Sequence, residues 1–322
     1  MKMNPGLLLI LLAAILVGAP AQAQDKPHRV GLLTISDAKG FGDGIAKNLT
    51  QQGYVLGRDL VITTRSADGK PDRLPALAKE FVAEAPEVIV TLGYPTAVAA
   101  RQATTTIPLV VAAVGDPVAT GFAASLSRPG GDITGVSDVA SELSAKRLQL
   151  LKAAVPGLKR VAMLWNADDL GMTLRYKSAE AAAKNLGIAV QPLGVREPDD
   201  FDAAFAAMTR DKPGGILMVT DVLTILNRKR VFEFAAAQRL PAIFEADNFV
   251  HDGGLMSYGP DGKERLARLA YLVDRILKGA KPADLPFELP TRFIFAVNLK
   301  TAGAIGLTIP QLLLTEADEV VE

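Results

Sequence analysis

The chain contains no cysteine among its 322 residues. Disulfides, a thiol nucleophile and cysteine-ligated zinc or iron–sulfur sites are therefore excluded. Neither sign of charge is in excess, because 35 Lys and Arg balance 35 Asp and Glu. A nucleic-acid binder normally carries a basic surplus, so we expect no nucleic-acid partner. What is present, 49% hydrophobic and 22% charged residues, is typical of a globular chain long enough for about two domains.

One long apolar run stands at the start of the chain. Residues 7–17 (LLLILLAAILV) follow Lys2 and precede the small-residue stretch 18–23. A positive head, an apolar middle and a small-x-small end are typical of a secretory signal peptide. The run is shorter than the roughly 20 residues that span a bilayer, although a membrane anchor or a core helix is the alternative. We predict that residues 1–23 are a signal peptide cleaved after Ala23, which leaves a soluble periplasmic protein.

From residue 28 onward, short β-rich runs alternate with longer helical ones. In the first series, strands are expected at 29–35, 59–64, 87–92, 109–114 and 133–136, and helices at 41–52, 73–85 and 96–102. After a helix at 142–154, the second series has strands at 160–165, 188–193, 215–219 and 240–244, and helices at about 170–186, 199–209 and 222–238. This alternation indicates parallel sheets with helices on both faces. The sequence therefore predicts an α/β protein of two Rossmann-like, doubly wound lobes.

The last 70 or so residues are too few for a third unit of this kind. They suggest a strand at 254–258, a helix at 261–278, one or two strands at 287–298, and a last helix near 310–322. We expect these pieces to be shared between the two lobes, so that the chain crosses between them more than once.

Eight short blocks of the mature chain carry a further signal. They are 53–58 (GYVLGR), 69–75 (GKPDRLP), 102–108 (QATTTIP), 114–117 (VGDP), 128–135 (RPGGDITG), 164–166 (LWN), 253–261 (GGLMSYGPD) and 298–303 (NLKTAG). In content and order they resemble the bacterial ABC-transporter substrate-binding proteins related to aromatic amino-acid binders. The resemblance implies a type I periplasmic binding-protein fold, in which two lobes joined by three crossovers hold a ligand in their cleft. It assigns 27–138 and about 253–281 to lobe 1, and 139–252 and about 285–322 to lobe 2.

Ligand contacts are expected beyond the carboxyl ends of the strands, where helix N-termini offer free N–H groups. In the first lobe this rule selects Ser36, Gly93, Tyr94, Thr96, Ser137 and Asp138. Pro95 suits a first helical position, so the amides at 96–98 are candidates for holding a carboxylate. Asp116 is either the partner of a ligand ammonium or the cap of the following helix. Phe41 lies in an expected glycine-rich loop that is able to close over a ligand.

The same rule selects Asn166, Thr220, Asp221 and Glu245 in the second lobe. Asp221 is either a partner for a ligand amine or a helix N-cap. The aromatic residues at strand ends supply either apolar contact with a ligand or core packing, and they are Tyr94, Trp165, Phe244 and Tyr258.

Catalytic and cofactor motifs are incomplete. The sequence GFGDG at 40–44 lacks the third glycine of a dinucleotide fingerprint, whose place is taken by Ile45. The segment 135–139 lacks the final glycine of a nucleophile elbow, and neither His28 nor His251 has a partner at metal-ligand spacing. Asp168 and Asp169 are read as helix caps. We expect no metal, no cofactor and no enzymatic activity.

The leading hypothesis is therefore a periplasmic solute receptor. We expect it to act as a monomer that closes about its hinge on a small ligand, an amino acid or a related small carboxylate, and delivers it to an ABC permease. One alternative is a protein that presents its ligand to a membrane sensor. The other is an exported hydrolase that uses Ser137 or His251.

Overall fold

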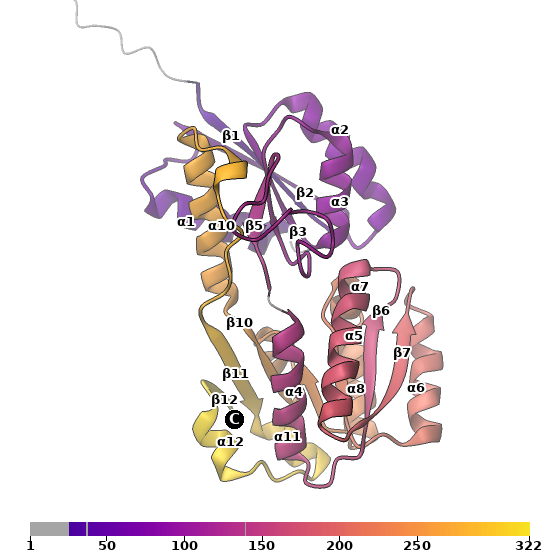
Figure 1. The fold of residues 1–322 in the computed structure, drawn as a ribbon. Coiled ribbons are helices and arrows are strands. Elements are labelled where there is room, and N and C mark those ends of the chain that lie inside the picture. Colours follow the sequence, from indigo (N-terminus) through magenta and orange to yellow (C-terminus); the bar gives the residue numbers. More distant parts are fainter. Residues whose placement is uncertain (1–25, 37, 139) are drawn as a thin grey trace, which may run out of the picture.

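Two separate β-sheets organise the chain, one in each lobe (Figure 1). The computed structural model describes residues 26–36, 38–138 and 140–322, so the predicted signal peptide lies outside the described residues. Both sheets carry helices on their two faces, which confirms the prediction of two α/β lobes. Within the described ranges, no helix combines the length and hydropathy that a bilayer span requires.

The first sheet has five strands in the order β2-β1-β3-β4-β5, and all of its neighbours run parallel. The strands are β1 (His28–Thr34), β2 (Leu60–Ser66), β3 (Val88–Leu92), β4 (Leu109–Ala112) and β5 (Ile133–Val136). One face packs against α1 (Ala38–Gln51) and α10 (Gly262–Leu277), and the other against α2 (Leu74–Glu84) and α3 (Tyr94–Ala103). Alternate side chains of β1 show this division, since Leu32 belongs to the α1/α10 core and Leu33 to the α2/α3 core. A 3-10 turn, η1 (Pro71–Arg73), leads into α2.

The second sheet has seven strands in the order β12-β11-β10-β9-β8-β6-β7. They are β6 (Arg160–Asn166), β7 (Ala189–Val195), β8 (Ile216–Met218), β9 (Ala242–Phe244), β10 (Met256–Pro260), β11 (Phe293–Asn298) and β12 (Glu319–Val321). One face packs against α4 (Ala140–Ala154), α5 (Leu170–Asn185), α11 (Leu299–Ile305) and α12 (Gln311–Glu316). The other packs against α6 (Asp200–Asp211), α7 (Val222–Leu226), α8 (Arg228–Ala237) and α9 (Asn248–His251). Only β10 and β11 pair antiparallel among these described strands.

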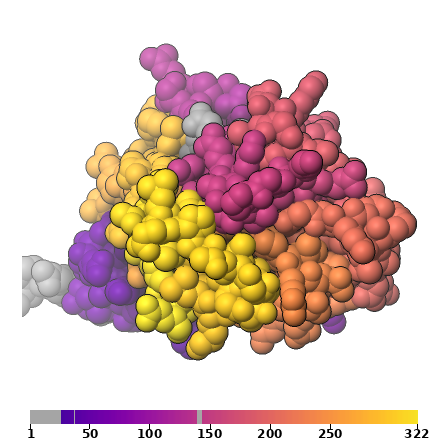
Figure 2. All heavy atoms as spheres, turned by 90° about the horizontal axis from the view of Figure 1, so that it is seen from below, coloured from indigo at the N-terminus to yellow at the C-terminus, as the bar shows by residue number. Residues whose placement is uncertain are grey.

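The predicted elements are confirmed over most of the chain, and two C-terminal ones differ. The expected helix at 222–238 is two helices, which meet at Asn227. The expected helix over 310–322 is wrong beyond Glu316, because 319–321 adds a parallel strand to β11. The β-branched Val320 and Val321 favour a strand there, and the carboxylate of Asp318 accepts the N–H of Phe295 at 2.8 Å. Helix α12, which precedes this strand, lies beside α4 (Figure 2), and Lys146 of α4 pairs with Glu316 of α12 at 3.8 Å.

The chain passes between the lobes after β5, between β10 and α10, and before β11 (Figure 1). The crossing points differ from those expected. Strand β10, expected in the first lobe from about 253, pairs with β9 and β11 in the second sheet, and only α10 packs on the first. A Cβ on Gly259 would lie 1.7 Å from the carbonyl oxygen of Glu245, which follows β9. The absence of a side chain at Gly259 therefore lets β10 lie against this segment in the second sheet. The segment at 285–288, after the 3-10 turn η2 (Pro282–Asp284), stays on the first lobe, since Glu288 bridges to Val136.

Two glycines provide a test of this sheet geometry. A Cβ on Gly135 would lie 1.9 Å from the carbonyl oxygen of Val111 on the neighbouring strand. We therefore expect Gly135→Ala to lower the free energy of unfolding by about 1–3 kcal/mol, measured by chemical denaturation. The matched control is Gly303→Ala in α11, where a Cβ meets nothing within 4 Å. That change is expected to raise stability by up to about 1 kcal/mol, and equal effects of the two substitutions would contradict the assigned strand pairing.

Candidate functional site

A cleft of about 1140 Å³ lies between the lobes, at the carboxyl ends of the strands of both sheets. Eight of the expected ligand-contacting residues line it: Ser36, Phe41, Gly93, Tyr94, Asn166, Thr220, Asp221 and Glu245. Asp138, also selected from the sequence, lines it too. The residues that the sequence selected in the two lobes therefore line one cavity.

Four of the expected residues do not line this cleft. Thr96 is fully buried and donates its hydroxyl to the carbonyl of Gly93 at 2.6 Å. Asp116 caps the turn that follows it by accepting N–H groups of the next residues at 2.9 and 3.2 Å. Ser137 is buried at the first crossover, where its N–H is bonded to the carbonyl of Glu288 at 2.8 Å.

Tyr258, the fourth, packs its ring against Phe293, with centroids 6.0 Å apart. Two other aromatic residues are also placed by packing. Trp165 stacks on Tyr176 with ring centroids 3.8 Å apart, as part of the core of the second lobe. Phe41 touches the cleft but is only 3% exposed, and it belongs to helix α1. The expectation that Phe41 lies in a glycine-rich loop able to close over a ligand is therefore wrong.

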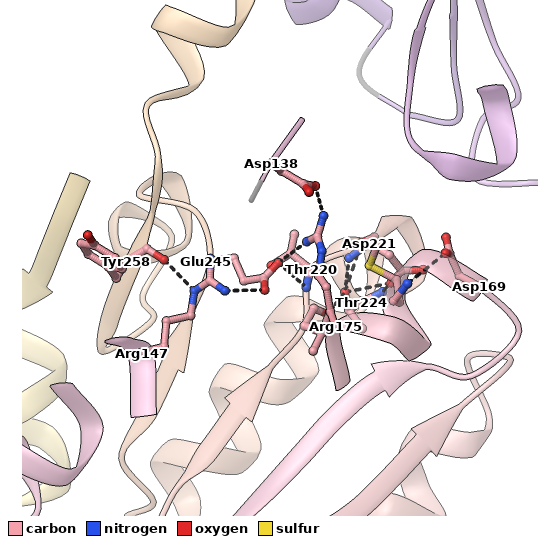
Figure 3. Close-up of polar contacts among 11 residues, drawn as sticks. Asp138, Arg147, Asp169, Arg175, Thr220, Asp221, Thr224, Glu245 and Tyr258 are labelled. Atoms are coloured by element: carbon pink, nitrogen blue, oxygen red, sulfur yellow. Dashed lines mark hydrogen bonds and ion pairs between the residues drawn. The ribbon is translucent and has the colours of Figure 1, made fainter. Parts of the chain in front are cut away.

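A buried network of charges forms the floor of the cleft (Figure 3). Glu245, at the end of β9, receives Arg147 from α4 at 2.8 Å and Arg175 from α5 at 2.7 Å, one on each carboxylate oxygen. The N–H of Thr220 adds a third bond to this carboxylate at 3.0 Å. Arg175 also pairs with Asp138 at the first crossover. One side chain thereby joins the second lobe to the hinge.

The network is neutral as a whole, with two guanidinium groups against two carboxylates. Arg147 is 2% exposed and Glu245 6% exposed, so each charge has lost most of its hydration. Burial opposes the ionisation of Glu245, but the two arginines and the Thr220 amide outweigh it and hold the pKa of Glu245 below its ordinary value. Removing one member would leave an uncompensated buried charge, which typically costs about 3–5 kcal/mol.

Two carboxylates lie side by side at the second-lobe wall, and both cap helices. Asp221 accepts the N–H of Thr224 at 2.9 Å while the Thr224 hydroxyl accepts the N–H of Asp221, which makes a capping box at the start of α7. Its other oxygen accepts Asn166 Nδ2 at 2.6 Å. Asp169 caps α5 by accepting the N–H of Met172 at 3.1 Å, as the sequence predicted. Both acids also line the cleft.

The lobes touch each other beside the cleft. A Cβ on Gly115, in the loop after β4, would lie 3.2 Å from the Cα of Gly171 in α5. Gly69 of the first lobe, with φ +78°, approaches the side chain of Leu226 in α7. The small residues at these points permit a backbone approach that larger side chains would prevent, so the described arrangement has its lobes in contact.

Besides Arg196, sequence reasoning missed three cleft arginines that stand on helices: Arg147, Arg175 and Arg265. Each stands on the apolar face of its helix. Arg147 lies four residues from Leu143 and from Leu151, and Arg265 four residues before Leu269. A charged residue at a core-facing helical position is the signal that identifies them.

Comparison with known proteins now places the fold. The family model for ABC transporter substrate-binding proteins matches residues 37–321. The chain belongs to this family. The binding protein is 26% identical to the "Tyrosine-binding protein" of Clostridioides difficile over 264 residues, which is 82% of this chain and 76% of the relative.

Two solved structures share the whole architecture. A conserved domain protein from Vibrio cholerae matches with a TM-score of 0.87 and 26% identity, covering 92% of the binding protein and 100% of that chain. An ABC domain from Streptococcus pneumoniae in complex with L-Trp matches with a TM-score of 0.86 and 25% identity over the same shares. The prediction of a substrate-binding protein related to aromatic amino-acid binders, with a type I periplasmic binding-protein fold, is confirmed.

Asp169 gives a pH-dependent prediction for this site. Burial raises the pKa of Asp169 from its ordinary 3.8 to about 6, and the Asp221 carboxylate adds to the rise. A raised pKa favours the protonated form in the fold, so the contribution of Asp169 to stability is greatest below about pH 3.8 and is lost as pH rises through 6. Asp169→Asn keeps a capping oxygen and removes the buried charge, and should raise the free energy of unfolding at pH 7 by up to about 3 kcal/mol.

The gain in free energy of unfolding that Asp169→Asn brings over the wild type should shrink as pH falls from 7 to 4. Denaturant unfolding of both proteins across that pH range measures it. The control is Asp168→Asn, at an exposed neighbour that should change stability little at any pH. A loss of stability in Asp169→Asn at pH 7 would show instead that the ionised cap is favourable.

Proposed function

We propose that this binding protein captures an amino acid with an aromatic or other apolar side chain and presents it to an ABC permease in the inner membrane. It acts as an exported monomer without catalytic activity, after removal of the N-terminal segment. The observation that carries the proposal is the composition of the interlobe cleft, in which charged strand-end groups and apolar walls face the same space.

The second-lobe wall suits a ligand ammonium group. Asp221 and Asp169 both line the cleft, and each carboxylate is held in place by backbone N–H groups of its helix. A positive group placed between them would gain two charge-assisted hydrogen bonds and relieve the repulsion between two neighbouring acids. We therefore propose that the amine end of the ligand binds at this wall.

Apolar side chains of both lobes line the remaining space. Tyr94 and Val98 come from α3 of the first lobe, and Leu223 and Leu226 from α7 of the second. These surfaces can bury a ring only when the lobes are together, so ring burial favours the closed arrangement. The names of two relatives, a tyrosine-binding protein and a protein bound to L-Trp, support an aromatic ligand.

Titration of the mature chain tests this proposal. Calorimetry with L-tyrosine, L-tryptophan and L-phenylalanine should give saturable binding with a negative heat-capacity change, the mark of apolar burial. Asp221→Asn should weaken binding of these amino acids by roughly 10- to 100-fold, since the bond to the ammonium loses its charge. The cap at α7 is kept, so the fold should remain.

Asp168→Asn serves as the matched control, because Asp168 also lines the cleft but is exposed and paired with Arg196 at 3.2 Å. The affinity of Asp168→Asn for the three amino acids should stay within about threefold of the wild-type value. Absence of binding for all three amino acids, in calorimetry and in thermal shift, would overturn the proposed ligand class.

A further inference from the structure

We infer that Arg265 forms an ion pair with the carboxylate of the bound ligand and thereby restricts the cleft to ligands with a free carboxylate. This inference rests on the proposed function and names the group that sets its specificity. Arg265 stands in the first turns of α10, which packs on the first sheet, and it lines the cleft.

Arg265 is the arginine of the cleft that has no acidic partner within the described chain. The other three are paired: Arg147 and Arg175 with Glu245, and Arg196 with Asp168. No ion pair or side-chain hydrogen bond of the described residues involves the Arg265 guanidinium, and its Nε is buried without a partner. Guanidinium groups in partly buried sites are normally matched by a carboxylate, so the partner is expected to come from outside the chain.

No ion pair of the described residues neutralises the charge of Arg265. The neighbouring network of Arg147, Arg175, Glu245 and Asp138 is balanced within itself. Arg265 adds one cation to this balanced group. Burial lowers the pKa of Arg265, and the repulsion from Arg175 lowers it further. The attraction of a bound anion would offset both effects.

Asp261 and Asp247 are the two acids whose charges raise the pKa of Arg265, and both already accept hydrogen bonds from other residues. Asp261 accepts the N–H of Lys263 at 2.7 Å as the N-cap of α10, and it lies 3.5 Å from Arg292. Asp247 accepts the N–H of Asn248 at 2.9 Å. Neither comes within ion-pair distance of Arg265, although both raise its pKa. These two acids therefore leave the N–H donors of Arg265 unoccupied.

The position of Arg265 also gives the ion pair a mechanical role. The planar guanidinium can bind both oxygens of a carboxylate at once. Because α10 belongs to the first lobe and Asp221 to the second, an amino acid held by its carboxylate and by its ammonium group would connect the two lobes. A ligand lacking its carboxylate would bind one lobe only, and its binding would favour closure less.

The test compares L-tryptophan with tryptamine, which lacks the carboxylate, and with indole-3-propionate, which lacks the amine. The variants are Arg265→Gln and, as matched control, Arg196→Gln, which removes a cleft arginine that already has a partner. In the wild type, L-tryptophan should bind at least tenfold more tightly than tryptamine. In Arg265→Gln that difference should disappear, with L-tryptophan and indole-3-propionate weakened at least tenfold and tryptamine unchanged. Arg196→Gln should keep the wild-type order.

A stability measurement separates ligand anchoring from a structural role. Since Arg265 has no ion-pair partner among the described residues, the ligand-free Arg265→Gln variant should unfold at the wild-type temperature or above it, while losing the stabilisation that L-tryptophan confers. Lower ligand-free stability, with tryptamine weakened in parallel, would overturn the inference and leave Arg265 a structural residue. Equal wild-type affinity for L-tryptophan and tryptamine would overturn it while leaving the proposed function standing. A wild type that binds none of these three compounds, and neither L-tyrosine nor L-phenylalanine, would contradict the proposed function and this inference together.

Discussion

The carboxylate of Glu245 is the constraint on which the arrangement of the cleft depends. Its two oxygens are shared between Arg147 and Arg175, which come from two different helices, and the Thr220 amide fixes it to the end of the neighbouring strand. Through Arg175 the same group reaches Asp138, where the chain leaves the first lobe. Buried charges are tolerated only with good geometry. The first crossover is thereby held against the strand ends of the second lobe.

The ligand-facing groups follow from that arrangement. The charges of the floor balance one another, so the groups proposed to contact the ligand lie on the walls: the acids that cap α5 and α7 on one side, and α3 and Arg265 of α10 on the other. In the proposed function, helix capping and ligand binding use the same carboxylates, so the second-lobe acids would be oriented before a ligand arrives. The approach of Gly115 to Gly171 lets the lobes meet without a side chain between them.

The sequence predicted the two lobes and the use of strand ends because both depend on local patterns. Alternating β-rich and helical runs predict that neighbouring strands run parallel. The cleft lies where the carboxyl ends of those strands meet. The placement of β10 was not predictable, because its pairing with β9 depends on a close backbone approach at Gly259 that no local pattern signals. The pairing of Arg175 with Glu245, 70 residues away, is equally a property of the assembled fold.

Individual site residues also differ in how much of their role the sequence predicts. Asp221 and Asp169 could be read as caps from their position before a helix, and the structure shows that they also face the cleft. Thr96 follows the same strand-end rule as Gly93, yet it points into the protein and closes a bond to the carbonyl of Gly93. The strand-end rule chooses a loop, and the direction of each side chain within the loop depends on packing.

Closure of the lobes on a ligand is the central claim, and a distance across the cleft tests it most directly. Because the chain has no cysteine, Lys79→Cys in α2 and Lys229→Cys in α8, both exposed, can carry two spin labels without side reactions. Pulsed electron paramagnetic resonance should show a longer or broader distance distribution for the ligand-free protein, and a shorter, narrower one with saturating L-tryptophan. Identical distributions, in a sample whose binding of L-tryptophan is verified by calorimetry, would contradict the account.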